Sequence, residues 1–589
     1  MRPVSFGGCF GWLHPTQAGI GADTAVLLCS GLANDKLTGH RPLRLLADML
    51  ASAGYPTLRF DYPGTGDSCD PVTVDDWAQW QHSIHMAIDC LRADTGARRV
   101  VLAGLRIGAT LAALAAERRD DVAALVLLEP VLRGQSFIRG LATELSLAGV
   151  PPPAPDAALD LYELRLSAET VRNIAQTDLS GVRIPPPCRV AIFTAQSGPV
   201  LSNVVAHWKT GGADVICRDF AGLEPLLRPT FMNHEAGPDP TALLRWLRQA
   251  VPATPAAPGP RAALADRPLQ GDGWSESPLQ FGDRAQLFGM LCRPAGYAQG
   301  DLAVVIVNAS GDPHFGGGRL GVDLARGLAR AGIASLRMDF AGIGDSLHWT
   351  AAGDTPTHVM ETDRTRDMRA AVDALEALGY RRFAVQGLCS GAYHALHCGL
   401  SDARVERLLL VNLPVFEWQR GAPVEHLLVS GPSHYLRRMS EENVFTLLRR
   451  RNFDLRGPLF VLRTRLAERL YFAGLSLARR LGVKERTGFA RECLELLARR
   501  PASMLFLFAP GDAGLKRFER EFGPGGMWLP WGTLSIEPGI DHSLSRSEMR
   551  GIATDHMLRF LKSGLDGARN PIEAPIMRRR ETTSAAAAS

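Results

Sequence analysis

The stretch FAVQGLCSGAYHALHCGL, Phe383–Leu400, decides the fold. Its first four residues are typical of a buried strand, and its last eight predict a helix. Between them, Gly387 and Gly391 stand two residues before and two residues after Cys389. A side chain can stand at the tip of a sharp strand-to-helix turn when both of those flanking positions are small. For Ser390 the same positions hold leucine and alanine, so the register selects Cys389 as the exposed nucleophile.

This stretch belongs to an internal repeat. FGWL at Phe10–Leu13 returns as FGML at Phe288–Leu291, and LRFDYPGTGDS at Leu58–Ser68 returns as LRMDFAGIGDS at Leu336–Ser346. Both pairs are 278 residues apart (288 minus 10 and 336 minus 58). A second copy of the turn, GLRIGA at Gly104–Ala109, then matches GLCSGA after a few inserted residues. Because order and spacing are kept, the chain is a tandem duplication.

The repeat sets the expected domains. With 589 residues the chain is too long for one hydrophobic core. We expect α/β domains at 1–249 and 269–566, and a helical cap in the second domain at about 414–500. A Pro/Ala-rich linker at 250–268 is expected to form no packed helix or strand, and the tail at 567–589 is expected to be disordered. Apolar strands that alternate with helices predict mainly parallel sheets covered on both faces.

Composition excludes several functions. A net charge of +4 does not indicate nucleic-acid binding. The ten cysteines form no CxxC pairs or Cys/His clusters, so we expect no metal, no cofactor and no disulfide framework. The N-terminus lacks the apolar run of a signal peptide, and no apolar run is long enough to span a bilayer. We therefore expect a cytoplasmic protein, with a weak membrane-surface contact by the basic RRR of the tail left open.

The motifs resemble a known family. The D-x-x-G-x-G-x-S run at Asp339–Ser346 follows a strand, and Cys389 comes fifty residues after its first aspartate (389 minus 339). Both halves resemble α/β-hydrolases of the serine aminopeptidase, peptidase S33-like type. Cysteine in place of serine departs from that pattern and is shared in outline with dienelactone hydrolases and polyhydroxyalkanoate synthases. The first half is similar to hydrolase-like proteins found beside exosortase A systems, which implies arginine at its turn and a bacterial exopolysaccharide setting.

The resemblance implies a catalytic triad in the order nucleophile, acid, histidine. The second half offers SMLFLFAPGDAG, an apolar strand that ends in a turn with Asp512, and then IEPGIDHSLS with His542. Together with Cys389 these residues form the expected triad. Asp541 is a rival acid, although adjacent residues rarely orient each other's side chains.

The proposed chemistry is acyl transfer. His542 takes the proton of Cys389, and the thiolate attacks an acyl carbonyl to give a thioester. Because a free cysteine has a pKa near 8.5, an imidazolium partner is needed for a thiolate at neutral pH. The backbone N–H of Ser390 and an N–H of Ala309 or Ser310 would bind the oxyanion. A buried, unreactive cysteine is the alternative, and the turn around Cys389 argues against it.

The first half has lost this chemistry. Arg106 stands at the nucleophile position, and a guanidinium stays protonated. Ser197 stands at the acid position, and His234 is the candidate histidine. Arg106 either binds an anionic group or forms a structural ion pair, and a scaffold role for this half is the safer interpretation.

The cap suggests a partner. Residues 414–500 contain 17 Lys/Arg and 9 Asp/Glu, a net charge of +8 (17 minus 9). A basic, apolar cap suits an acyl ester or thioester carried by coenzyme A, an acyl carrier protein or an anionic lipid, and a merely solvated cap is the alternative. Two functions stay open: an esterase, thioesterase or acyltransferase, and a non-catalytic scaffold of a polysaccharide or lipid biosynthetic system. Peptidase action is not favoured, because no anionic pocket for a substrate amine can be identified.

Overall fold

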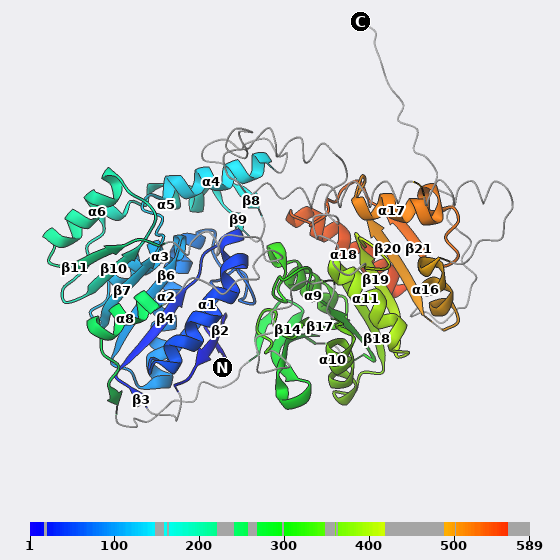
Figure 1. Ribbon diagram of the computed structural model, residues 1–589, viewed down its shortest axis with the longest axis horizontal. Coiled ribbons are helices and arrows are strands. Elements are labelled where there is room, and N and C mark those ends of the chain that lie inside the picture. The colour runs from blue at the N-terminus through cyan, green and yellow to red at the C-terminus, as the bar shows by residue number, and fades with distance from the viewer. Residues whose placement is uncertain are drawn as a thin grey trace, which may run out of the picture.

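The computed structural model describes most of both predicted halves (Figure 1). The described residues are 1–16, 21–147, 158–161, 164–220, 241–256, 268–296, 300–347, 360, 363–418, 470, 488–500 and 502–563. His234, most of the expected cap at 414–500 and the expected tail at 567–589 lie outside them.

The N-terminal half contains an eight-stranded sheet. Only its first two pairings, β1 with β2 and β2 with β5, are antiparallel, and all others are parallel. The strands lie in the order β1 (Arg2–Phe6), β2 (Cys9–His14), β5 (Thr57–Phe60), β4 (Thr24–Cys29), β6 (Arg99–Leu105), β7 (Val122–Leu128), β10 (Arg189–Phe193) and β11 (Asp214–Arg218).

The C-terminal half repeats this order, with one extra strand at its edge. The extra strand is β13 (Leu269–Gly271), and the order continues with β14 (Trp274–Phe281), β15 (Leu287–Pro294), β17 (Ala334–Asp339), β16 (Leu302–Ile306), β18 (Arg382–Leu388), β19 (Val405–Val411), β20 (Ser503–Phe508) and β21 (Thr533–Ile536). Even the register is repeated, since Gly11 pairs with Phe60 in the first sheet and Gly289 with Met338 in the second.

Helices cover both faces of each sheet (Figure 1). In the first half, α1 (Asn34–Ser52) and α8 (Thr241–Ala250) pack on one face, and α2 (Asp76–Thr95) and α3 (Ile107–Ala116) on the other. In the second, α9 (Leu320–Arg330) and α18 (Ser547–Lys562) lie opposite α10 (Thr365–Ala377) and α11 (Ser390–Ser401). Each half therefore has the α/β-hydrolase fold, as the sequence predicted.

Shorter elements surround these layers. They are α4 (Gly134–Leu147), α5 (Ala168–Gln176), α6 (Pro199–Thr210), α16 (Phe489–Ala498) and α17 (Ala513–Phe522), with the strand pairs β8 (Leu159–Leu161) and β9 (Leu164–Leu166), and β3 (Gly21–Ala22) and β12 (Pro255–Ala256). Strand β12 corrects one expectation. It belongs to the proposed linker, yet its residues pair with β3 because alanine and an edge-strand proline both allow extended pairing.

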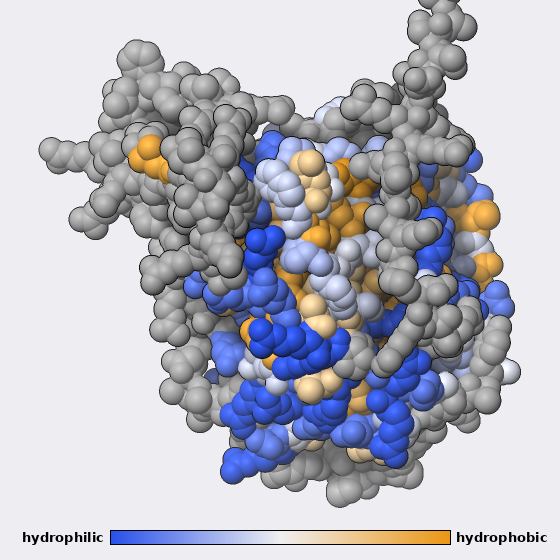
Figure 2. All heavy atoms as spheres, turned by 90° about the vertical axis from the view of Figure 1, so that its right-hand side faces the viewer, coloured by the Kyte–Doolittle hydropathy of each residue, from blue (hydrophilic) through white to orange (hydrophobic). Residues whose placement is uncertain are grey.

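The outer end of the second half carries apolar surface. Figure 2 views the molecule from this side and shows apolar side chains among charged ones. Large apolar residues are exposed here on α16 (Phe489 and Leu496) and in the loop after α17 (Met527 and Trp528). Among the helices of the described residues, none combines the length and the apolar character needed to cross a bilayer.

The repeated FGxL motifs lie where the two halves meet. The rings of Phe10 and Phe288, equivalent residues of the two repeats, stack with centroids 6.4 Å apart. Trp12 packs edge-on against Phe288 at 4.7 Å, and one apolar cluster contains these rings together with α9 and α18. The two halves thus share a core, and the motif that revealed the duplication forms part of their interface.

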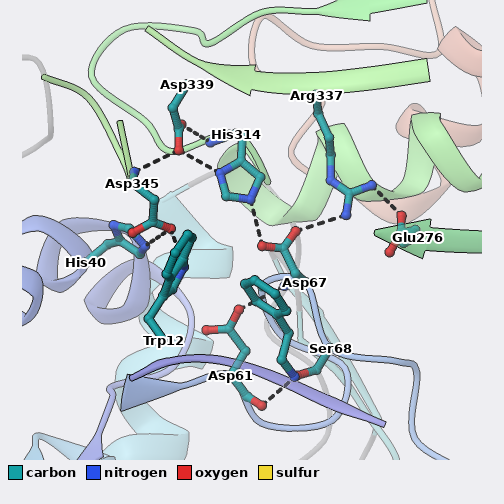
Figure 3. A network of polar contacts seen from close by, with 12 residues as sticks. Trp12, His40, Asp61, Asp67, Ser68, Glu276, His314, Arg337, Asp339 and Asp345 are labelled. Atoms are coloured by element: carbon teal, nitrogen blue, oxygen red, sulfur yellow. Dashed lines mark hydrogen bonds and ion pairs between the residues drawn. The ribbon is translucent and has the colours of Figure 1, made fainter. Parts of the chain in front are cut away.

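The repeated aspartate loops cross this interface reciprocally. Asp67 accepts a hydrogen bond from Arg337 Nη2 at 2.9 Å (Figure 3), and Asp345 accepts one from Arg59 Nη2 at 2.5 Å. The two aspartates are equivalent in the repeat, and so are the two arginines (345 minus 67 and 337 minus 59 are both 278). Reciprocal pairing of this kind is the pattern of a two-fold symmetric dimer, here built within one chain.

Candidate active site

Cys389 stands at the turn between β18 and α11. Its backbone has φ 53° and ψ −120°, a conformation that L-residues rarely adopt and that costs on the order of 1–3 kcal/mol. A hydrogen bond from its N–H to Val411 O, 2.9 Å long, ties the turn to β19. A Cβ on Gly391 would lie 2.6 Å from Asn308 O, and one on Gly387 would lie 2.1 Å from Gly391. Any larger residue at Gly387 or Gly391 would therefore collide with neighbouring backbone, which is why the turn needs glycine at both positions.

The structure brings His542 and Asp512 together. Nδ1 of His542 lies 2.6 Å from Oδ2 of Asp512, and the other carboxylate oxygen accepts the N–H of Gly514 at 2.7 Å. Asp512 is buried and caps α17, so its side chain cannot rotate freely. Burial lowers the pKa of His542, but the hydrogen bonds with Asp512 and Cys389 outweigh it and raise the pKa to about 10. The Asp512 carboxylate and Cys389 thus both favour the protonated form of His542, which lines the same cavity as Cys389.

Asp541, the alternative acid, forms hydrogen bonds within its own loop. Its Oδ1 accepts the N–H groups of Ser543 and Ser545 at 3.0 and 3.1 Å, and its Oδ2 accepts the Ser545 hydroxyl. It holds the shape of the loop that carries His542, and it is not the residue that orients the imidazole.

Asn412 was missed by sequence reasoning. It directly follows β19, is fully buried and has φ 49°. Its Nδ2 donates to His542 O at 2.9 Å and to Asp541 O at 3.2 Å, while its Oδ1 accepts the N–H of Ala509 at 2.8 Å. The Asn412 side chain thus connects the loop that carries His542 to the end of β20, which leads to Asp512. A polar residue that closes the apolar run LLLVN was the available signal.

The expected oxyanion donors line the same cavity as Cys389. Ser390 is the first residue of α11, where a helix has unpaired N–H groups, and Ala309 and Ser310 lie in the turn after β16. The N–H of Ser310 donates to Ser390 Oγ at 2.6 Å. An acyl oxygen would have to displace this hydroxyl to use the Ser310 donor, a competition that the sequence did not reveal.

A cavity of about 260 Å³ opens in front of these groups. Cys389, Ser390, Ala309, Ser310 and His542 all line it. Asp512 does not line it and lies on the other side of the imidazole ring, where it contacts Nδ1. Cys389, His542 and the expected donor residues therefore face one partly open cavity.

Arg106 has the same backbone conformation as Cys389, but its side chain forms an ion pair with Asp35. Its φ of 56° and ψ of −121° match those of Cys389. Its Nε lies 3.3 Å from Oδ2 of Asp35, in the first turn of α1. Of the two alternatives for Arg106, the structure shows an ion pair within the protein. Ser197 lies in the loop between β10 and α6, where the other half has Asp512.

His314, Asp339 and Asp345 form the one cluster within the described residues that has the spacing of a metal site. However, His314 places Nδ1 2.7 Å from Asp339 and Nε2 2.6 Å from Asp67 (Figure 3). The two carboxylates overcome the effect of burial and raise the pKa of His314 well above its usual value. A ring protonated on both nitrogens has no lone pair for a metal, so this cluster is an interface ion network.

The chain thus combines the α/β-hydrolase fold with the side-chain types of a hydrolase site. The family described as serine aminopeptidase, S33, matches residues 22–171, which lie in the half with Arg106. The search of curated proteins found no match. Among solved structures, Est1E from Butyrivibrio proteoclasticus with ferulic acid bound is 18% identical, with a TM-score of 0.31, over 43% of this chain and 99% of that one. The esterase PF2001 of Pyrococcus furiosus is 12% identical, with a TM-score of 0.30, over 49% and 91%. An alpha-beta serine hydrolase homologue from Coxiella burnetii is 15% identical, with a TM-score of 0.28, over 49% and 96%.

Proposed function

We propose that the chain is a hydrolase-fold enzyme that transfers acyl groups from esters or thioesters through Cys389. The observation that carries this proposal is the hydrogen bond between His542 Nδ1 and Asp512 Oδ2, 2.6 Å long, with Cys389 at the wall of the same cavity as the imidazole. Nucleophile, base and orienting acid are the minimum set for covalent acyl transfer.

The reaction would run in two stages. The sulfur of Cys389 attacks the acyl carbonyl, and the oxyanion is held by the N–H of Ser390 and by a donor of the Ala309–Ser310 turn. When the carbon–oxygen or carbon–sulfur bond breaks, the imidazolium of His542 gives its proton to the leaving group. Water or another acceptor then attacks the thioester, His542 takes the proton of that nucleophile, and the acyl group leaves the regenerated cysteine. Because thioesters react readily with amines and thiols, transfer to a second molecule is as suitable an outcome as hydrolysis.

The first half would serve as a partner domain without catalysis. Its nucleophile position holds an arginine that is paired with Asp35, and its acid position holds Ser197. We assign residues 1–249 to this domain and 269–566 to the catalytic one. A carrier such as coenzyme A or an acyl carrier protein stays part of the proposal through the basic composition of residues 414–500. A cytoplasmic setting accords with ten cysteines that are all free thiols.

Selective alkylation tests the proposal. Purified protein is treated with substoichiometric iodoacetamide, the labelled peptides are quantified by mass spectrometry, and turnover of p-nitrophenyl esters and acyl thioesters is measured in parallel. We expect Cys389 to be labelled first and Cys389→Ala to lose turnover. Buried Cys398, in the same helix region, provides the matched control as Cys398→Ala. Turnover that survives Cys389→Ala would refute the assignment.

A further inference from the structure

The cavity in front of Cys389 has a wall that belongs to the other half of the chain. Asn34, Leu37 and Thr38, in the first turn and a half of α1, line it together with residues of the catalytic half. Thr38, 351 positions before the proposed nucleophile, thus faces the same space (389 minus 38). The site is incomplete without the N-terminal half.

Contacts across the interface fix this wall in place. Arg44, one turn and a half further along α1, donates from Nη1 to Gly344 O at 2.5 Å and to Ser346 O at 2.9 Å. Lys36 lies over the ring of Phe315 at 5.5 Å, and the ring of His40 packs edge-on against the same phenylalanine at 5.5 Å. Helix α1 is therefore held to the catalytic half by groups on both sides of Leu37.

Arg106 contacts the same turn of α1. It forms an ion pair with Asp35, which directly precedes Lys36 and Leu37 at the start of the helix. The residue that replaces the nucleophile in the first half therefore anchors the helix turn that lines the cavity of the second half.

The lining has an apolar character. Leu37 of the first half faces the space together with Leu320, Leu388 and Pro313 of the second. Two polar groups of the wall have partners within the protein, since Thr38 Oγ1 donates to Asn34 O and Asn308 Nδ2 donates to Asp312 O and Asp339 Oδ1. The cavity volume of about 260 Å³ leaves room for a chain of several carbon atoms. A neutral aliphatic chain suits such a space better than a charged headgroup.

We propose that helix α1 of the N-terminal half forms the acyl-binding wall of the catalytic site, and that the substrate carries an aliphatic acyl group of medium length. This inference rests on the proposed function for the identity of the acyl group, but the pocket itself can be tested without any turnover. Leu37 is the residue that should set the accepted chain length, because it is the largest apolar side chain that α1 places in the lining.

The test compares the labelling of Cys389 by N-ethylmaleimide and N-octylmaleimide, with labelled peptides counted by mass spectrometry. In Leu37→Trp, which fills the cavity, we expect the octyl-to-ethyl rate ratio to fall at least tenfold. In Leu37→Ala, which enlarges it, the ratio should stay equal or rise. Leu45→Trp is the matched control, because Leu45 is an exposed leucine of the same helix that does not line the cavity. Thermal unfolding of each variant verifies that it is folded.

The outcomes separate the two proposals. If Leu37→Trp lowers the ratio while Leu45→Trp does not, the acyl wall is supported, even if no ester or thioester is turned over and the proposed function fails. If turnover depends on Cys389 while the ratio in folded Leu37→Trp equals that of the unaltered protein, the function stands and the wall is refuted. For an active enzyme, the ester profile provides a second readout: Leu37→Trp should move the preferred p-nitrophenyl ester to shorter chains.

Discussion

Asp67 of the N-terminal half accepts a hydrogen bond from His314 of the C-terminal half, with 2.6 Å between Oδ2 and Nε2. His314 lines the cavity in front of Cys389 and lies four residues after Ser310, in the segment that holds the proposed oxyanion donors. An aspartate of the N-terminal half thus anchors a segment of the proposed site in the C-terminal half. The duplication has produced one structural unit out of two folds.

Asp67→Asn should destabilise the whole chain. The substitution leaves His314 and Arg337 buried with one counter-charge fewer, which typically costs about 3–5 kcal/mol. Urea unfolding followed by tryptophan fluorescence measures the loss. Asp283, an exposed aspartate that pairs with the exposed Arg366, offers Asp283→Asn as a control with a much smaller effect. Equal losses in both variants would contradict a central role for Asp67.

Both acid and alkali should weaken this interface. The charged partners hold the pKa of Asp67 and of Asp345 below the usual range, despite burial. Carboxylates with a depressed pKa contribute stability that is present above about pH 4 and is lost as the pH falls. His314 has a raised pKa, so its contribution is fully present below about pH 6.5 and is lost progressively as the pH rises above that value. We expect the melting temperature to fall steeply below about pH 4 and to decline again above about pH 6.5. A flat acid profile would contradict this assignment.

Asp512→Asn should shift the pKa of His542 but have little effect on the stability of the fold. Without the carboxylate the pKa of His542 should drop from about 10 towards its ordinary value near 6.5, because the remaining burial favours the neutral ring. NMR of ¹³C-labelled histidine measures the shift. Alkylation of Cys389 at pH 7 should slow at least tenfold as the imidazolium is lost. Asp541→Asn is the control, since that carboxylate binds loop N–H groups. An unchanged His542 titration in Asp512→Asn would overturn the triad.

Asn412→Ala should affect the histidine loop. It leaves the N–H of Ala509 and two loop carbonyls without their side-chain partner, at a cost of about 1–3 kcal/mol for the buried groups. Because the loop that carries His542 is then held less firmly, we expect turnover to fall roughly 10- to 100-fold with a smaller change in KM. If kcat stays unchanged in a folded variant, Asn412 has a structural role only.

Arg106→Ala tests the function assigned to the altered nucleophile position. Since the guanidinium is partly exposed, loss of its ion pair with Asp35 should cost no more than about 1 kcal/mol. The labelling of Cys389 by N-ethylmaleimide should not change, whereas labelling by N-octylmaleimide should slow as the first turn of α1 loosens. Arg98→Ala, which removes a largely exposed ion pair with Asp23, controls for charge. Slower labelling by both reagents would indicate a general disturbance.

Parts of the site could be predicted from the sequence because they depend on local geometry. The glycines around Cys389 are required by the close approach of backbone atoms in one turn, and such a requirement is visible in adjacent residues. The candidates Asp512 and His542 followed from the order of elements in the fold that the motifs resemble. The role of Ser390 Oγ as acceptor for the Ser310 N–H, and that of Asn412, could not be found in this way, because their partners lie 80 to 130 residues away.

The sequence by itself determined the α/β-hydrolase fold of both repeats, since strand and helix patterns, turn glycines and the repeat length are all properties of neighbouring residues. Only the tertiary structure decided how the repeats combine. The pairing of Asp67 with Arg337 and of Asp345 with Arg59, and the position of Leu37 before Cys389, depend on surfaces that meet after each half has folded. A buried charge is stable only next to an opposite charge, and that partner can come from any part of the chain. The spacing of residues along the sequence therefore does not show which charges pair.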